Sequence, residues 1–219
     1  MSTIVWFRED LRLADNPALS AAAERGPVLP VFILNEHTTR VPGAASLWWL
    51  HHSLRALADD LSDLSLHNGD PESVLARLAR QTGATAIYWN RRYSPWAIAQ
   101  DTAVKMHLSD IGLEVRSFNA ALLNEPWEIA TGNDTPYKVF TPYWKAARSR
   151  PVAAPLPAPT ITPLQYPNDS EKLTDWALTP RNPNWAPTWV DHWQPGEAGA
   201  HIRLTEFLNT GLRDYGQDR

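Results

Sequence analysis

The chain has 219 residues, a formal net charge of −4 and a hydrophobic content of 43%. These values exclude a disordered chain and are ordinary for one large or two small globular domains. Cysteine is absent, which excludes disulfides, thiolate metal sites and a cysteine nucleophile. No signal peptide or membrane-length apolar segment is visible, so we expect a cytoplasmic protein without a membrane partner.

Five short runs are expected to be strands, over 3–7, 28–34, 65–67, 85–89 and 113–118. The best of them are continuously apolar, which is typical of strands covered on both faces. Three helices are expected to start where a capping residue precedes proline, at Asn16-Pro17, Asp70-Pro71 and Ser94-Pro95. The repeated order of strand, turn and helix predicts an α/β fold, a doubly wound five-stranded parallel sheet of Rossmann-like type with helices on both faces.

A leucine stripe predicts a further helix packed on the core, because leucines recur at spacings of three and four at positions 47, 50, 54, 57, 61 and 64. On that helix, the adjacent His51 and His52 point about 100° apart, so we do not expect them to share a metal.

No other metal, P-loop, dinucleotide or nucleophile-elbow motif is present.

Polar side chains follow three of the expected strands: Arg8, Glu9 and Asp10; Asn35 and Glu36; Asn90, Arg91 and Arg92. In a parallel sheet these loops meet at the carboxyl edge, where ligands bind near the reversal of strand order. A polar ligand site at this edge is one interpretation. The other is an internal network of arginine and carboxylate groups that only ties the loops together, and the residues alone leave both open.

The composition changes after residue 122. Ten of the 19 prolines and four of the 11 tryptophans lie between residues 151 and 195. Proline disfavours long helices and ladder pairing, so we expect an extended connector over 123–196, packed through its aromatic side chains. Residues 197–219 are expected to form one helix with Leu204, Phe207 and Leu208 on one face. A single helix cannot bury that face alone, so it is expected to begin a further domain.

Several stretches together resemble the DNA photolyase/cryptochrome family. Residues 6–16 (WFREDLRLADN) are similar to its N-terminal signature W-F-R-x-D-L-R-x-x-D-N, with every fixed position present. Residues 68–71 (NGDP) resemble its third strand-to-helix turn, and residues 88–90 with Tyr93 resemble its fourth strand end. Thr131-Gly132 and residues 136–145 (PYKVFTPYWK) resemble its connector motif, which makes interdomain candidates of Tyr137, Lys138, Phe140, Thr141 and Tyr143.

The resemblance implies an antenna domain over 1–122 that binds a light-harvesting chromophore, then the connector, then a helical domain that holds FAD and contacts damaged DNA. It implies the N-terminal part of a photolyase, a carbon–carbon lyase that uses light to repair cyclobutane pyrimidine dimers. The family's FAD-binding segment does not occur in these residues, so no catalytic residue is expected here and the FAD domain is the expected partner. A cryptochrome photoreceptor half and a free-standing α/β ligand-binding module are the alternatives.

The resemblance places the antenna at the carboxyl edge, with Arg8, Asp10, Asn35, Asn90 and Trp96 as candidate contacts. Folate-type photolyases commonly carry an Asn-Glu pair where Trp96 and Ala97 stand here. Neither accepts a pterin's hydrogen bonds as a carboxylate does, although an indole can stack on a flat ring. This disfavours the usual folate mode and leaves a deazaflavin, a differently placed folate or an empty site as the expectation for the chromophore. Helix-to-sheet packing is the other interpretation of Trp96.

The charged cluster after the first strand is expected mainly to fix its own loop. Arg8 and Arg12 can form bidentate pairs with Asp10 and Asp15. We expect Arg12 and Asp15 to hold the loop, and Arg8 and Asp10 to lie nearest the antenna.

Overall fold

The computed structural model describes residues 1–35, 42–61, 63–164 and 169–218. Its strands are β1 (Thr3–Phe7), β2 (Val28–Leu34), β3 (Ser65–Asn68), β4 (Ala86–Asn90) and β5 (Glu114–Phe118). The helices between them are α1 (Pro17–Arg25), α2 (Ala44–Leu61), α3 (Pro71–Thr82) and α4 (Pro95–Asp110). Each strand lies within one residue of the range that the sequence predicts.

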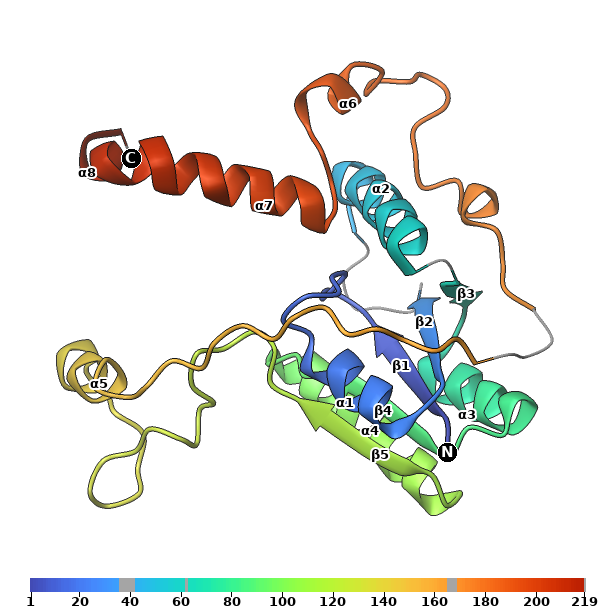
Figure 1. Ribbon diagram of the computed structural model, residues 1–219, viewed down its shortest axis with the longest axis horizontal. Helices are drawn as coiled ribbons and strands as arrows, with labels where there is room; N and C mark the ends of the chain where they lie inside the picture. Colours follow the sequence, from blue (N-terminus) through green and yellow to red (C-terminus); the bar gives the residue numbers. More distant parts are fainter. Residues whose placement is uncertain (36–41, 62, 165–168, 219) are drawn as a thin grey trace.

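The five strands form one parallel sheet in the order β3-β2-β1-β4-β5. The chain adds β2 and β3 on one side of β1 and then returns to place β4 and β5 on the other, so the order reverses between β1 and β4. Helices α1 and α2 cover one face of the sheet, and α3 and α4 cover the other (Figure 1). The predicted doubly wound α/β fold is confirmed.

Strand β1 is buried on both faces, which is why its sequence shows no alternation of apolar and polar residues. Ile4 and Trp6 pack with α3 and α4, whereas Val5 and Phe7 pack with α1 and α2. Each such side chain contributes about 1.5–3 kcal/mol when fully buried. The two cores together fix the register of the sheet and therefore the position of its carboxyl edge.

The predicted helix starts are confirmed at Pro17, Pro71 and Pro95, although only two of the expected caps form. The side chain of Asn16 accepts a hydrogen bond from the Leu19 N–H at 3.1 Å, and that of Asp70 accepts one from the Ser73 N–H at 3.0 Å. Ser94 makes no side-chain cap hydrogen bond. The free N–H groups in the first turn of α4 therefore gain no acceptor from this side chain.

The leucine helix ends earlier than its stripe predicts. Helix α2 ends at Leu61, and Leu64 lies beyond it, yet Leu64 is still buried in the same core. The apolar spacing of the helix therefore persists past the helix end, because Leu61 and Leu64 pack in one core.

The connector carries short elements of its own, α5 (Phe140–Ala147), a 3₁₀ turn η1 (Leu173–Trp176) and α6 (Trp189–His192). The sequence does not predict α5. The Val28 N–H donates to the Thr162 carbonyl at 2.8 Å, and the Glu171 N–H donates to the Leu66 carbonyl at 2.7 Å, so the connector attaches to two strands. It also packs through aromatic rings, as expected, with Trp189 5.2 Å from Trp48 between ring centroids.

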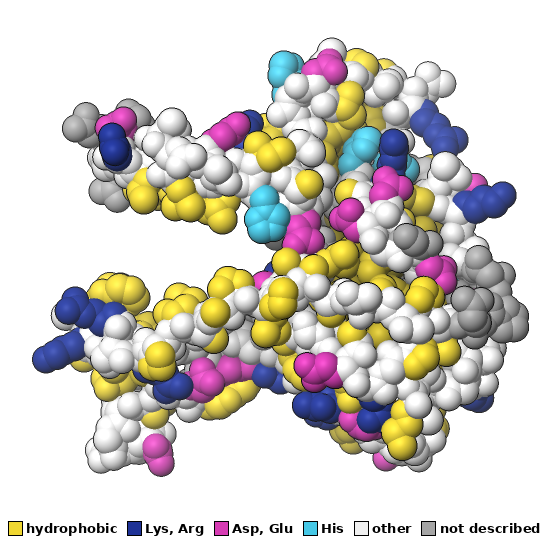
Figure 2. All heavy atoms as spheres, in the orientation of Figure 1, with side chains coloured by type: hydrophobic (Ala, Val, Ile, Leu, Met, Phe, Trp, Pro, Cys, Tyr) yellow, Lys and Arg dark blue, Asp and Glu magenta, His cyan; other side chains and the backbone are white. Residues whose placement is uncertain are grey.

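The last segment is helical from Glu197, but a π-helical turn interrupts it. Helix α7 (Glu197–Glu206) passes into η2 (Phe207–Gly211) and then α8 (Leu212–Asp218). This segment projects from the body, as α5 does from the connector, and a gap separates the two projections (Figures 1 and 2). In the described part of the chain, no helix has the length and apolar character needed to cross a membrane.

Candidate functional site

Arg8 follows β1 and turns its side chain into the protein. Its guanidinium binds the carboxylate of Asp101 on α4 and the backbone carbonyl of Asn90, and it lies 4.5 Å from the ring centroid of Trp6. Only 7% of Arg8 is exposed. The expected side-chain pair between Arg8 and Asp10 is therefore wrong. The buried guanidinium instead takes a carboxylate from the helix that packs beside β1.

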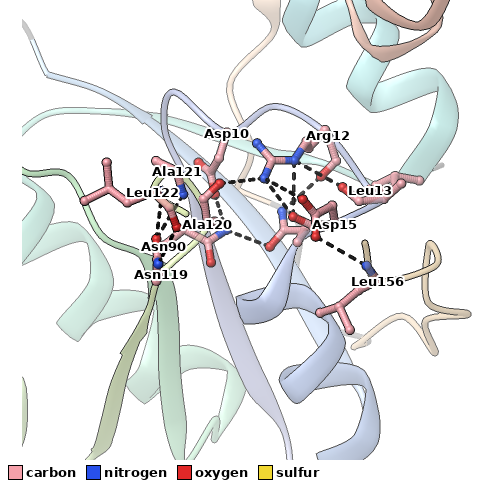
Figure 3. A network of polar contacts seen from close by, with 12 residues as sticks. Asp10, Arg12, Leu13, Asp15, Asn90, Asn119, Ala120, Ala121, Leu122 and Leu156 are labelled. Carbon is pink, nitrogen blue, oxygen red and sulfur yellow. Dashed lines mark hydrogen bonds and ion pairs between the residues drawn. The ribbon is translucent and has the colours of Figure 1, made fainter. Parts of the chain in front are cut away.

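The carboxylate of Asp10 holds the loop through uncharged donors (Figure 3). It accepts a hydrogen bond from the Arg8 backbone N–H at 2.8 Å and another from Nδ2 of Asn90 at 2.5 Å. Nδ2 of Asn90 also donates to Oδ1 of Asn16 at 2.7 Å, and the Asn90 oxygen accepts from the Ala18 N–H at 3.1 Å. Asn90 therefore joins the end of β4 to the start of α1.

Arg12 and Asp15 tie the same loop to more distant segments (Figure 3). The Arg12 guanidinium donates to the carbonyls of Asp15 at 2.7 Å and Ala120 at 2.8 Å, and it lies 3.9 Å from the Asp15 carboxylate. The Asp15 N–H donates to the Leu156 carbonyl at 2.8 Å. Backbone carbonyls, rather than a bidentate carboxylate, take most of the Arg12 donors. We refer to residues 8–16 as the signature loop.

A cavity of about 630 Å³ opens beside the signature loop at the carboxyl ends of β1 and β2. This volume lies within the range of small-molecule sites. We call it the smaller cavity; its lining includes Trp6, Arg8, Glu9, Asn35, Arg92, Trp96, Gln100 and Trp176. Arg8, Asn35 and Trp96 from the predicted set thus come together. Glu36 lies outside the described residues.

Trp96 forms part of the wall of the smaller cavity and is not buried against the sheet. It is 42% exposed, and the Arg92 guanidinium lies 4.7 Å from the centroid of its ring. Ala97, the next residue, is fully buried. Helix-to-sheet packing is therefore the wrong interpretation of Trp96.

Asp101 contacts both arginines of the smaller cavity, although it is not among the lining residues itself. One oxygen pairs with Arg8 and lies 3.7 Å from Arg92, while the other accepts the Trp89 indole N–H at 3.0 Å. Burial, and after it the charge of Arg8, lowers the pKa of Arg92, although Asp101 and Glu9 oppose this shift. Sequence reasoning missed Asp101, because consecutive polar residues on α4 give it no distinctive periodicity.

A second cavity of about 1030 Å³ lies between the signature loop, α2 and α7, and we call it the larger cavity. Asp10, Arg12 and Asp15 line it, and Arg8, Glu9 and Leu50 line both cavities. Asn90, by contrast, is buried in the loop network and is among the lining residues of neither. The predicted antenna candidates Asp10 and Asn90 therefore lie behind the smaller cavity rather than in its wall.

Glu197 at the start of α7 is one of the residues that line the larger cavity. Its carboxylate accepts hydrogen bonds from the backbone N–H groups of Leu13 at 2.7 Å and Ala14 at 3.0 Å. Sequence reasoning also missed this residue, since an acidic side chain in a first helical turn is ordinary. The contact fastens α7 to the signature loop.

The connector motif lies around α5, away from both cavities. Tyr137 and Tyr143 have their ring centroids 6.3 Å apart, and Phe140 stacks on Trp144 at 6.3 Å. Lys138 and Thr141 are exposed, and Phe140 is 71% exposed. These side chains form an open aromatic surface.

His51 and His52 pack as rings, 5.2 Å apart, and His52 also lies 4.3 Å from Trp48. Burial lowers the pKa of each imidazole. In the described ranges no group of three His, Cys, Asp or Glu side chains has metal-binding geometry.

The strand order and the position of the smaller cavity define a Rossmann-like α/β domain with a cavity beside the reversal of strand order, the place where ligands bind in such folds. Comparison with known proteins then gives the family. The sequence model of DNA photolyase matches residues 3–160, and the chain belongs to the DNA photolyase family. The resemblance inferred from the motifs is confirmed.

Relatives come from both branches of the family. The chain is 45% identical to deoxyribodipyrimidine photo-lyase of Agrobacterium fabrum, over 99% of its own length and 46% of the relative's. It is 36% identical to cryptochrome-2 of Arabidopsis thaliana, over 99% and 37% of the two lengths. A bacterial class III photolyase from Agrobacterium tumefaciens superposes with a TM-score of 0.90 at 45% identity, covering 100% and 46% of the chains. The chain thus spans about half the length of this curated photolyase.

Proposed function

We propose that this chain is the N-terminal, antenna-binding part of a deoxyribodipyrimidine photolyase, and that the smaller cavity holds the light-harvesting chromophore. One observation carries the proposal: the indole side chains of Trp6, Trp96 and Trp176 line one cavity at the carboxyl edge of the sheet. They come from β1, α4 and the connector. Indole faces and edges suit a flat conjugated ring.

The residues of the smaller cavity fit such a chromophore. Its volume of about 630 Å³ suits a ring system with a substituent. The indole N–H of Trp6 is buried and has no acceptor in the described part of the chain, so a ring oxygen or nitrogen would complete its hydrogen bonding. Deazaflavin and folate both offer such atoms, and we propose one of these two classes.

The remaining assignments belong to the same proposal. Residues 1–122 form the antenna domain, 123–196 the connector and 197–219 the first helix of the FAD domain. The open aromatic surface around α5, with Tyr137, Lys138, Phe140, Thr141 and Tyr143, contacts that domain. FAD and damaged DNA are bound by the half of the photolyases that has no counterpart in these 219 residues, and the protein is cytoplasmic.

Photolyase is preferred over cryptochrome because the identity is 45% to a photolyase and 36% to a cryptochrome over nearly the whole chain. A repair assay separates the two. The chain joined to its FAD domain should split thymine dimers under blue light, whereas a photoreceptor would leave them intact. The 219-residue chain alone, with added FAD and light, should leave them intact in either case.

The antenna assignment is tested by the absorption spectrum of the purified chain, with any released chromophore identified by mass. If the chromophore is lost on purification, methenyltetrahydrofolate and 8-hydroxy-deazaflavin are added back. We expect a near-ultraviolet or visible band from one of the two, and Trp96→Ala should weaken its retention several-fold. The matched control is Trp127→Ala, since Trp127 is exposed and lines neither cavity. Protein absorption alone in the presence of both chromophores would contradict the assignment.

A further inference from the structure

Two arginines supply the positive charge of the smaller cavity. Among the described residues that line it, Arg8 and Arg92 are the cations and Glu9 is the carboxylate. The Arg8 side chain is 6% exposed and that of Arg92 is 16% exposed, so both guanidinium groups are largely removed from water. A buried cation is retained only where an anion or several hydrogen-bond acceptors compensate it.

That compensation is incomplete in the protein itself. Asp101 binds Arg8 closely but lies 3.7 Å from Arg92, and one carboxylate balances one of the two cations. Glu9 lies 3.6 Å from Arg92, but its side chain is 74% exposed, where solvent screening leaves an ion pair little strength. Within the described ranges, Nε of Arg8 and Nε of Arg92 are both buried without an acceptor. Arg92 also donates to the Gln100 amide oxygen at 2.7 Å, but among the described residues of the cavity the donors and the positive charge still exceed the acceptors and the negative charge.

Helix α4 adds to the excess of positive charge at the smaller cavity. It begins at Pro95, three residues after Arg92, and Ser94 makes no side-chain cap hydrogen bond. The N-terminus of a 16-residue helix carries a partial positive charge. The pKa of Arg92, lowered first by burial and then by Arg8, agrees with a cation short of negative charge.

We propose that Arg92, supported by Arg8, binds an anionic group of the cavity's ligand, a carboxylate or a phosphate, while the ligand's ring lies against Trp96. The anionic group takes the place of Glu9 on the Arg92 guanidinium, and Asp101 is the positioning residue that keeps both arginines at the cavity. This inference rests on the proposed function, because it names the part of the antenna ligand that is recognised.

Two matched pairs of probes separate the contribution of the anionic group to binding from that of the ring. They also distinguish a phosphate from a carboxylate. Riboflavin and FMN share a ring and differ by a phosphate; folic acid and its dimethyl ester share a ring and differ by the two carboxylates. Binding to the 219-residue chain is followed by fluorescence titration. We expect the anionic member of at least one pair to bind about tenfold more tightly than its uncharged partner. Arg92→Gln should abolish this preference, and Arg92→Lys should keep part of it.

The control is Glu9→Gln, which should increase the preference because it removes the competing carboxylate. Equal binding of charged and uncharged members would overturn the inference and leave the proposed function standing. Equal weakening of both members in Arg92→Gln would also overturn it, since this would indicate loss of packing against Trp96 rather than of a charge contact. Failure of all four probes to bind would overturn this inference, whereas the proposed function is decided separately by the add-back of methenyltetrahydrofolate and 8-hydroxy-deazaflavin.

Discussion

The side chain of Asn90 uses its hydrogen-bonding groups within the protein. Both amide hydrogens point to oxygens of the signature loop, and the amide oxygen accepts the Ala18 N–H. Asp10 therefore faces two donors, the Asn90 amide and the Arg8 backbone N–H. A carboxylate accepts from both donors without any hydrogen of its own, so this position requires an acid.

The first prediction follows from that requirement. In Asp10→Asn, one oxygen remains to accept a hydrogen bond, and the new amide group places a donor against a donor. We expect the free energy of unfolding to fall by about 1–3 kcal/mol in urea denaturation. Asp15→Asn is the matched control, because Asp15 has φ +51°, which Asn tolerates, and its carboxylate is half-exposed. Equal stability of the two variants would contradict the assigned role of Asp10.

A second prediction concerns the buried imidazole of His67 in β3. Its Nε2 lies 2.8 Å from Oγ of Ser65, and its Nδ1 lies 3.4 Å from Nη2 of Arg77. Because a guanidinium only donates, Nδ1 is the acceptor and the neutral ring carries its hydrogen on Nε2. Burial lowers the pKa of His67, and although Asp169 opposes this shift, the net direction is downward.

The unfolded chain therefore binds a proton at His67 at a higher pH than the folded chain does. Stability should be constant above the ordinary histidine pKa of about 6.5 and should fall as the pH drops below it. Urea titrations between pH 7.5 and pH 5 should show this fall, and His67→Gln should reduce its slope. His51 and His52 shift in the same direction, so some slope remains. His192→Gln, at an exposed position, is the control, and a slope unchanged in His67→Gln would refute the prediction.

At the scale of elements, patterns within a few residues of sequence predict the strands and helices of the sheet domain. The partners of the site residues depend on contacts between segments far apart in the sequence. The runs that become β1 and β2, and prolines such as Pro17 and Pro71, carry their signals within a few residues, so their elements are predictable. Arg8 takes Asp101 as its partner, 93 residues away, rather than Asp10. Glu197 reaches Leu13 across 184 residues. Sequence reasoning places Arg8 and Trp96 at the carboxyl edge, but only the packing of α4 and α7 determines these partners.

A third prediction concerns the attachment of α7. The Glu197 carboxylate accepts hydrogen bonds from the backbone N–H groups of Leu13 and Ala14. In Glu197→Ala, we expect both amides to exchange hydrogen with solvent at least tenfold faster, because their protection depends on that carboxylate. Glu206→Ala is the control, since Glu206 pairs with Arg203 within the same helix. Unchanged exchange at Leu13 and Ala14 would show that packing alone holds α7.

At the scale of the whole molecule, two projections present apolar side chains to each other across a gap. Figure 2 shows such side chains along the edge of the α7–α8 projection and along the facing edge of the α5 projection. The exposed apolar residues of these projections include Phe140, Trp144, Leu204, Leu208, Leu212 and Tyr215. Monomeric proteins rarely leave contiguous apolar surface of this kind exposed, so these surfaces are suited to contact with another folded unit.

The fourth prediction concerns the 219-residue chain in the absence of another folded unit that covers these apolar side chains. The exposed surfaces should bind a hydrophobic dye and drive self-association, which sedimentation velocity at increasing protein concentration would detect. Leu204→Glu with Leu208→Glu should reduce both, because these residues are 53% and 55% exposed and a charge there opposes apolar contact. Met106→Glu, on α4 and 63% exposed, is the matched control and should change neither. A monomer at all concentrations with no dye binding would contradict the prediction. If the FAD domain of the proposed function is the unit that covers these side chains, adding it should suppress both signals.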